Sequence, residues 1–288
     1  MQLIMSSFFA IFTEQRDFMK KFLFVLMSFP FIAFAGNDNH HIGGREAGMG
    51  NASVGLHSVW SAHHNQAGLA FVNDISAGLY FENRFLLKGL SIQGGAFALP
   101  TKSGTFGLAI THFGDKNYSE GKYGLSYGRK LGENVAMGLG LNYVSTRFGG
   151  TYGKAGTVTA ELGFQTKLLD KLTLGAHVYN PLRVTIDQDR IERIPVILRI
   201  GGAYEFSEKV IASVEVEKDI DYKGIVKAGL EYKPTEKIYL RAGVASNPVY
   251  SSFGVGLNLS QFQVDFSTSY HYTLGFTPQI GLRYKFKK

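Results

Sequence analysis

The most regular feature of the chain is an alternation of apolar and polar side chains over its final third, from about Ile194 to Phe286. Apolar residues occupy every second position in the segments 238–244, 253–259, 262–270 and 280–286. A period of two places one set of side chains on each face of a β-strand. One face is aliphatic or aromatic, and the other carries glycine, small polar residues and charge. Strands of about ten residues with two such unlike faces are typical of membrane-spanning barrels.

The same pattern, traced back along the chain, predicts fourteen strands and an all-β fold. Bacterial transmembrane barrels have an even number of strands, with short periplasmic turns and longer external loops. The predicted connections alternate in this way. The sequence therefore predicts a 14-stranded antiparallel transmembrane β-barrel, multi-pass in the outer membrane of a Gram-negative bacterium, with both termini periplasmic. The predicted strands are 75–85, 89–99, 104–113, 119–129, 134–147, 155–167, 171–179, 195–206, 209–218, 223–233, 237–246, 251–260, 262–271 and 276–287.

The two faces of the predicted strands are expected to meet different surroundings. The apolar set, which includes Leu240, is expected to face lipid, and the small or polar set, which includes Ala245, is expected to face the lumen. Aromatic side chains near the membrane interfaces form girdles in such barrels. Close to the predicted short turns, the residues expected in such a girdle are Tyr127, Phe164, Phe206, Tyr232 and Tyr284.

The first 35 residues predict a secretory signal rather than part of the fold. Lys20 and Lys21 precede an apolar stretch, residues 22–32, that is shorter than a membrane-spanning helix, and residues 33–35 read Ala-Phe-Ala. This is the pattern of a signal peptide with its cleavage site, starting at Met19. Residues 1–18 are then an upstream extension, or an unusually long n-region of the signal, and residues 19–35 are the signal peptide. The alternative is an apolar helical anchor over residues 1–35.

Composition narrows the class further. The 288 residues include 35 glycines and no cysteine, and the formal net charge is +7. Without cysteine there is neither a disulfide framework nor a thiolate metal site. The mean hydropathy is −0.01, which argues against a bundle of transmembrane helices but suits a barrel with a polar lumen. Because the basic residues are scattered singly, we expect no nucleic-acid partner.

The mature chain opens with a segment that does not alternate. Residues 36–74 are rich in small residues and contain Trp60, the only tryptophan, and a short helix is predicted around Ser53–Trp60. We interpret residues 36–74 as an N-terminal hatch inside a barrel formed by residues 75–288. Glycines recur on the inward face of the predicted strands, where glycine weakens a strand. We expect them to let the hatch backbone approach the wall closely.

A family resemblance supports this organisation. The stretches REAGMGNASVG, from Arg45, and SVWSAHHNQAGLA, from Ser58, resemble the opening of FadL-like outer-membrane transporters and their PorV/PorQ-type relatives. Residues 194–204 are a second local match. Asn65-Gln66 stands where that family usually has Asn-Pro. The resemblance implies a 14-stranded barrel with an N-terminal hatch in its lumen, and the terminal Tyr284-Lys285-Phe286 resembles the signal that such barrels present to the insertion machinery.

The candidate site residues lie on the hatch and on the inward face of the wall. Inward charges of mixed sign more often form salt bridges than a selectivity ring, so we expect them to hold the hatch to the wall, with solute binding as the alternative. The sequence identifies no specific ligand. The hatch candidates for a solute path are Met49, Leu56, Val59 and Trp60, and the lumen candidates are Glu161, His177, Arg199, Lys227, Arg241, Asp265 and Arg283.

The sequence contains no recognisable catalytic or metal-binding motif. His40, His41, His57, His63 and His64 lie close together in sequence, but no His-x-x-x-His pair or cysteine accompanies them. There is no G-x-S-x-G element, and the glycine-rich GGREAGMG follows no strand of a βαβ unit. We therefore predict no enzymatic activity, no metal and no cofactor.

Two functions are consistent with the sequence. The FadL-like resemblance implies passive transport of hydrophobic or small amphipathic solutes across the outer membrane, gated by the hatch. The PorV/PorQ-type resemblance implies an accessory barrel for protein secretion or surface attachment (type IX secretion), with specificity in loops such as Asn180–Ile194. The expected partners are outer-membrane lipid, the barrel insertion machinery, and either a hydrophobic solute or exported proteins. Of these two functions, we rank passive transport slightly ahead of the accessory role in secretion.

Overall fold

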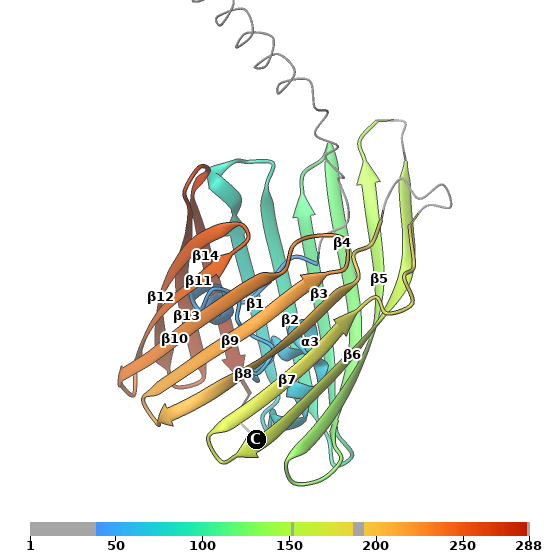
Figure 1. The fold of residues 1–288 in the computed structure, drawn as a ribbon. Helices are drawn as coiled ribbons and strands as arrows, with labels where there is room; N and C mark the ends of the chain where they lie inside the picture. The colour runs from blue at the N-terminus through green and yellow to red at the C-terminus, as the bar shows by residue number, and fades with distance from the viewer. Residues whose placement is uncertain (1–38, 151–152, 187–192, 287–288) are drawn as a thin grey trace, which may run out of the picture. The chain divides into compact units, whose positions relative to one another are not determined.

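The computed structural model describes residues 39–150, 153–186 and 193–286, and within them fourteen antiparallel strands form a closed barrel (Figure 1). Each strand pairs with its neighbours in sequence, and β1 pairs with β14 to close the ring. The predicted fold class and strand number are confirmed. The predicted upstream extension and signal peptide, residues 1–35, lie outside the described residues.

Every predicted strand has a counterpart within a few residues. The strands are β1 (Ser76–Asn83), β2 (Ser91–Pro100), β3 (Thr105–Gly114), β4 (Tyr118–Lys130), β5 (Val135–Phe148), β6 (Lys154–Leu169), β7 (Leu172–Tyr179), β8 (Ile197–Ser207), β9 (Val210–Asp219), β10 (Ile225–Thr235), β11 (Ile238–Ser246), β12 (Val249–Leu259), β13 (Phe262–His271) and β14 (Gly275–Lys285). A short 3₁₀ turn, η2 (Arg84–Leu86), follows β1. No helix among the described residues is long and apolar enough to cross a membrane.

The two ends of the barrel differ in their connections. At the end where β1 begins and β14 ends, here called the short-turn end, the strands are joined by tight turns such as Asp170-Lys171 and Glu208-Lys209. At the opposite end, the long-loop end, most connections are longer, and the longest joins β7 to β8. At Asn247-Pro248, however, β11 and β12 are joined by a turn as tight as those at the other end, and the three-residue connections 115–117 and 272–274 are no longer than the short-turn-end connections 101–104 and 131–134. The predicted alternation of connections thus holds only in part.

The apolar face of the strands points outward and the polar face inward. Leu125 on β4 is 68% exposed and Leu240 on β11 is exposed, whereas Ala245 is buried. Aromatic pairs on the outer face near the short-turn end join Phe106 to Tyr127 and Phe262 to Tyr284. These pairs form part of the predicted girdle, so the assignment of faces is confirmed.

Residues 39–72, here called the hatch segment, lie against the inner face of the wall (Figure 1). They contain two short helices, α2 (Gly44–Gly48) and α3 (Ser61–His64), and a 3₁₀ helix, η1 (Gln66–Phe71). An apolar cluster of Ile42, Val59 and Trp60 with Tyr80 and Ile92 joins the segment to the first strands. Isolated helices this short are not stable in water, so packing against the wall maintains them.

The helix predicted at Ser53–Trp60 is wrong. The backbone N–H groups of Ser53 and Val54 instead donate to one oxygen of Glu215, at 2.8 and 2.7 Å. The carbonyl of Val54 accepts from Asn65 and from Gln165 on β6. In a helix starting at Ser53, the carbonyl of Val54 would accept from the N–H of Ser58. Glu215 and Gln165 of the wall and Asn65 of the hatch satisfy these groups instead and hold the segment in an irregular conformation, which no local sequence pattern shows.

Inward glycines of the wall receive the hatch backbone. At Gly138 on β5, an added Cβ would lie 2.2 Å from the carbonyl carbon of Gln66, and at Gly243 on β11, 2.2 Å from the nitrogen of Gly50. Such separations exclude any side chain. The same contact, within 3.0 Å of a hatch backbone atom, occurs at Gly128, Gly163, Gly175, Gly229 and Gly281. The predicted reason for the repeated glycines is confirmed at these positions.

Candidate functional site in the barrel lumen

Glu161 is the centre of one buried polar network in the lumen. It projects inward from β6, and its carboxylate accepts hydrogen bonds from Lys122 at 2.5 Å and from Asn142 at 2.9 Å. Gln66 of the hatch segment also donates to it. The charge of a buried carboxylate must be matched by donors or by an opposite charge. Gln66 therefore connects the hatch to the wall here.

His177 on β7 links this network to Arg199 on β8. The Nη2 of Arg199 lies 3.1 Å from Nδ1 of His177, and Nε2 of His177 lies 2.9 Å from Glu161. A guanidinium can only donate, so Nδ1 must accept and Nε2 carries the proton that is donated to Glu161. This arrangement fixes a neutral imidazole. Arg199 itself is buried, and its Nε and Nη1 have no hydrogen-bond partner among the described residues.

A second network surrounds the Lys227 ammonium on β10. It contacts Glu217 at 2.7 Å and Glu215 at 3.3 Å, and it donates to Nε2 of His41 at 2.6 Å. His41, Glu215 and Glu217 are close enough together to hold a metal ion. The ammonium, however, already contacts all three groups and supplies the positive charge between them. Burial, together with Lys227, lowers the pKa of His41, which is consistent with a neutral acceptor.

The third network connects α2 to the wall. Arg45 forms two hydrogen bonds to the carboxylate of Glu231 on β10, at 2.7 and 3.0 Å, and Arg241 on β11 reaches the same carboxylate at 2.6 Å. Arg241 also bonds Asp265, which pairs with Arg283 at 3.5 Å. Burial alone would lower the pKa of Arg45, but Glu231 outweighs it and raises that pKa above its ordinary value.

All seven lumen candidates therefore lie in these networks. The expectation that inward charges hold the hatch to the wall applies directly to Arg45 with Glu231. Most other pairs join neighbouring strands, as Lys227 with Glu217 and Arg241 with Glu231 do, or strands two apart, as Lys122 with Glu161 does. Most of these residues contact an opposite charge, so their first role is to neutralise charge within the wall, while Nε and Nη1 of Arg199 have no partner among the described residues. Only Lys227 among the seven also lines the main cavity.

The four hatch candidates are packed rather than open. Val59 and Trp60 belong to the apolar cluster against the first strands, and Met49 and Leu56 pack against Ala203 on β8. All four are buried. None of them lines either of the two cavities described for residues 39–286.

The main cavity lies instead above the hatch segment, toward the long-loop end. Its volume is about 850 Å³. The hatch contributes Asn39, His40, His41 and Asn51. The wall contributes apolar and aromatic side chains from the ends of several strands, including Phe85, Pro195, Ile197, Tyr222, Ile225, Pro248 and Tyr250. These residues were missed in the sequence because they lie at strand ends, where the alternation stops and faces are no longer assigned by position.

Comparison with solved structures places this architecture among known barrels. The toluene transporter TodX of Pseudomonas putida superposes with a TM-score of 0.67 at 14% identity, covering 87% of this chain and all of TodX. The toluene transporter TbuX of Ralstonia pickettii gives 0.65 at 14% identity, over 89% of this chain and all of TbuX. This chain has their fold. A FadL homologue from Pseudomonas aeruginosa gives 0.57 at 13% identity, over 85% of this chain and 97% of its own.

Comparison of the sequence alone identifies no relative. No protein-family model matches the chain, and no curated protein matches it. At 13–14% identity the superpositions establish the shared barrel and nothing about the solute.

Proposed function

We propose that this protein is a passive outer-membrane transporter for small hydrophobic or amphipathic solutes. The observation that carries the proposal is the cavity of about 850 Å³ at the long-loop end, whose exposed surface is mainly apolar although polar and charged side chains also line it, and which the hatch segment closes on one side. Its size is in the range of pockets that hold small organic ligands. The fold it occupies is shared with two toluene transporters, which supports a solute of similar apolar character.

The location of the polar residues supports binding of an uncharged solute. The wall of the cavity offers Ile197, Ile225 and Pro248, whereas His41, Glu217 and Lys227 at its edge are engaged with one another. Ionised groups that are already paired need no charged ligand to balance them. A solute would therefore enter by burying apolar surface.

Passage through the lumen would require movement of the hatch segment. Its backbone lies directly against the glycines of the wall, so no path bypasses it along those strands. The interactions that would have to break include the ion pair of Arg45 with Glu231 and the hydrogen bond of Gln66 to Glu161. In this proposal the hatch is a gate, and solute binding above it shifts the equilibrium toward a displaced conformation.

The orientation follows from the connections. Short turns face the periplasm in outer-membrane barrels and longer loops face outside, so we place the cavity at the external surface, and the start of β1 and the end of β14 on the periplasmic side. The proposal includes no chemical step on the solute and no catalytic residue.

Uptake of a monoaromatic hydrocarbon, such as toluene, into liposomes carrying the refolded protein tests the proposal. Ile225 lines the cavity, and Val226 beside it points outward and is 51% exposed. Ile225→Trp should fill the cavity and lower the uptake rate several-fold, while Val226→Trp should leave it unchanged. Uptake no faster than that of empty liposomes, or an equal loss in both variants, would reject transport through this cavity.

The close fit of hatch and wall also supports a second candidate, an accessory barrel for protein export. A barrel whose lumen stays closed would act through its outer loops instead of its interior. Part of the relevant loop, residues 187–192 of the predicted Asn180–Ile194 region, lies outside the described residues. Comparing surface and secreted proteins of wild-type and deletion strains separates the two functions. Loss of a defined set of exported proteins would favour export, and an unchanged set would favour transport.

A further inference from the structure

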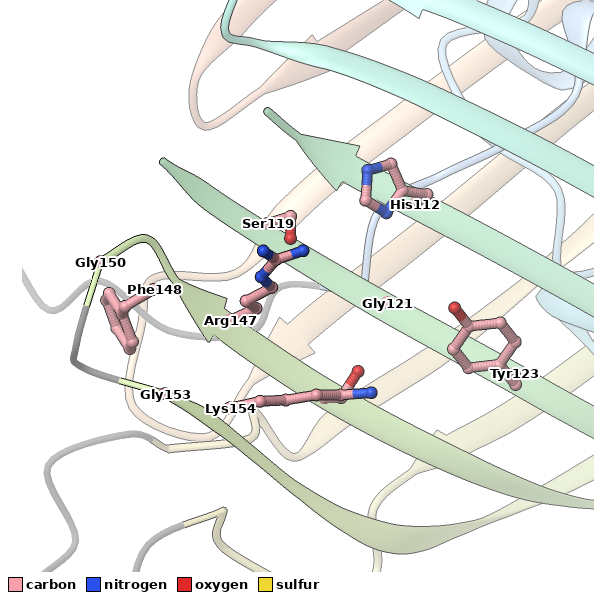
Figure 2. Close-up of a pocket in the computed structure, with 10 residues that line it drawn as sticks. His112, Ser119, Gly121, Tyr123, Arg147, Phe148, Gly150, Gly153 and Lys154 are labelled. Carbon is pink, nitrogen blue, oxygen red and sulfur yellow. The ribbon is translucent and has the colours of Figure 1, made fainter. Parts of the chain in front are cut away.

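A second cavity opens on the outer surface of the barrel, where β3, β4, β5 and β6 approach the long-loop end (Figure 2). Its volume is about 500 Å³, and its lining includes His112, Gly121, Ser145, Arg147 and Lys154. On β4 and β5, residues 121, 145 and 147 have the same parity as the outward-facing Tyr123 and Tyr143. The cavity therefore belongs to the surface expected to contact lipid, not to the lumen.

Strand register arranges this surface in rows. Cross-strand pairing aligns Ile110, Tyr123, Tyr143 and Val158 in an apolar row. The next row toward the long-loop end is His112, Gly121, Ser145 and Gly156. The row beyond it is Gly114, Ser119, Arg147 and Lys154. The surface thus changes from apolar to small and then to basic, and the small row forms the floor of the notch.

The basic row lies at the depth of a membrane surface. Ser119, in that row, and the outward Arg129 near the other end of β4 are ten positions apart in sequence. At about 3.4 Å per residue and a tilt of about 40°, this separation spans about 26 Å along the membrane normal. The apolar band of such a barrel is about 25 Å tall. Arg147 and Lys154 therefore lie where lipid headgroups begin, with the notch just below them.

The two cations have no acidic partner within the described residues. Neither Arg147 nor Lys154 forms an ion pair with any described carboxylate, and the contact of Lys154 is with the ring of Tyr143, 5.7 Å from its centroid. Both side chains are exposed. The inward charges of this barrel are nearly all paired, so this outer pair stands apart.

We propose that this notch binds the phosphorylated headgroup of an outer-leaflet glycolipid. The proposal rests on the outer-membrane orientation of the proposed function. Arg147 and Lys154 would bind a phosphate, because a guanidinium and an ammonium are the cations that proteins use for that group. The floor of Gly121 and Ser145 leaves room for a sugar ring or the start of an acyl chain. Tyr123 and Tyr143 below it offer aromatic faces against which the chain would pack.

The depth and chemistry of the notch favour this occupant over a protein partner. A protein bound at this point would have to enter the headgroup layer, whereas the lipid is already there. Charge complementarity also points to an anion, since three basic side chains and no acid line the notch.

The test measures binding of a bisphosphorylated, acylated glucosamine disaccharide to the detergent-solubilised barrel by native mass spectrometry. Arg147→Gln with Lys154→Gln should weaken binding at least tenfold. The matched control, Lys102→Gln with Arg129→Gln, removes two exposed cations at the short-turn end and should leave binding unchanged. The same lipid without phosphates should bind wild type at least tenfold more weakly.

Three results would overturn the inference: no binding to wild type, equal losses in both double variants, or no preference for the phosphorylated lipid. Ser145→Trp fills the notch without removing charge and should also weaken binding of the acylated lipid. Its failure to do so would overturn the notch as the site. Every variant is first checked for folding by heat-dependent gel mobility. Hydrocarbon uptake by the same proteins in liposomes reports on transport separately, so absence of lipid binding by the wild type with its uptake intact rejects this site alone.

Discussion

At the scale of single residues, one absent side chain decides whether the hatch segment fits. The position that a Cβ would take at Gly138 is 2.2 Å from the carbonyl carbon of Gln66 and 2.3 Å from the nitrogen of Ala67. These are backbone atoms, which unlike the end of a flexible side chain cannot turn aside. At Gly132, in the turn between β4 and β5, nothing lies within 4 Å of the same position.

Gly138→Ala should therefore destabilise the folded barrel by about 1–3 kcal/mol, the usual cost of overpacking. Gly132→Ala should change its stability by much less. The measurement is the urea midpoint of unfolding, followed by the gel shift between folded and unfolded forms. Equal midpoints for the two variants would mean that the hatch is not seated against β5.

The sequence predicted the purpose of such glycines because their positions follow the period of two. It did not predict the cavity residues Phe85, Pro195 and Tyr222, which lie in connections outside any strand. Alternation assigns a side chain to a face only while the backbone stays extended. The candidate site was therefore predictable where strands are regular and unpredictable at their ends.

At the scale of elements, α2 depends on the wall for its position. A helix of five residues does not persist alone in water, and Arg45 ties this one to Glu231 through two charge-assisted hydrogen bonds. Because Arg241 still neutralises Glu231 when Arg45 is removed, the stability lost is only that of the Arg45–Glu231 ion pair.

Arg45→Met should weaken the seating of the hatch by about 1–3 kcal/mol, in line with loss of a charged hydrogen bond. We expect higher single-channel conductance in planar bilayers, because a displaced hatch admits water and ions. Lys233→Met, which breaks an exposed pair with Glu236, should leave the conductance at the wild-type value. An unchanged conductance in Arg45→Met would contradict a gate held by this contact.

The outer face of β4 tests the membrane band. Leu125 is 68% exposed and lies midway along the strand, whereas Leu131 is 61% exposed in the turn that follows. Leu125→Arg should cost about 2–4 kcal/mol in folding titrations into lipid bilayers, and Leu131→Arg about 0–1 kcal/mol. Similar costs at the two positions would show that β4 does not cross the hydrocarbon layer.

The mistaken helix at Ser53–Trp60 shows why the hatch was harder to predict than the strands. Its backbone hydrogen bonds go to Glu215 and Gln165, more than 100 residues away in sequence. A helix can be predicted from the spacing of residues close together in the sequence, but the conformation of this segment depends on its contacts with the barrel wall. Strands β8 to β14 needed no such information because their alternation was already complete.

At the scale of the whole molecule, closure of the ring satisfies every strand edge. β1 is paired with β14 over seven residues, so the barrel has no exposed edge among the described strands. Complete pairing is the condition for a sheet to exist in lipid. The even strand count predicted from the sequence follows from the same condition.

A closed barrel of this kind should resist cold SDS and change its gel mobility only after boiling. Folded and boiled samples run side by side provide the measurement. Identical migration of the two samples would be incompatible with a stable transmembrane barrel. The variant Gly138→Ala, if folded, should shift at a lower temperature than wild type.

The glycine contacts also set the order of events in biogenesis. The hatch segment ends at Val72 and β1 begins at Ser76, so the hatch is tethered beside the β1–β14 seam. Its backbone lies directly against glycines from β4 around to β14, with no slack for threading it in later. The hatch segment must therefore be in place before the last strand closes the seam. Zipping β14 onto β1 encloses a hatch that is already seated.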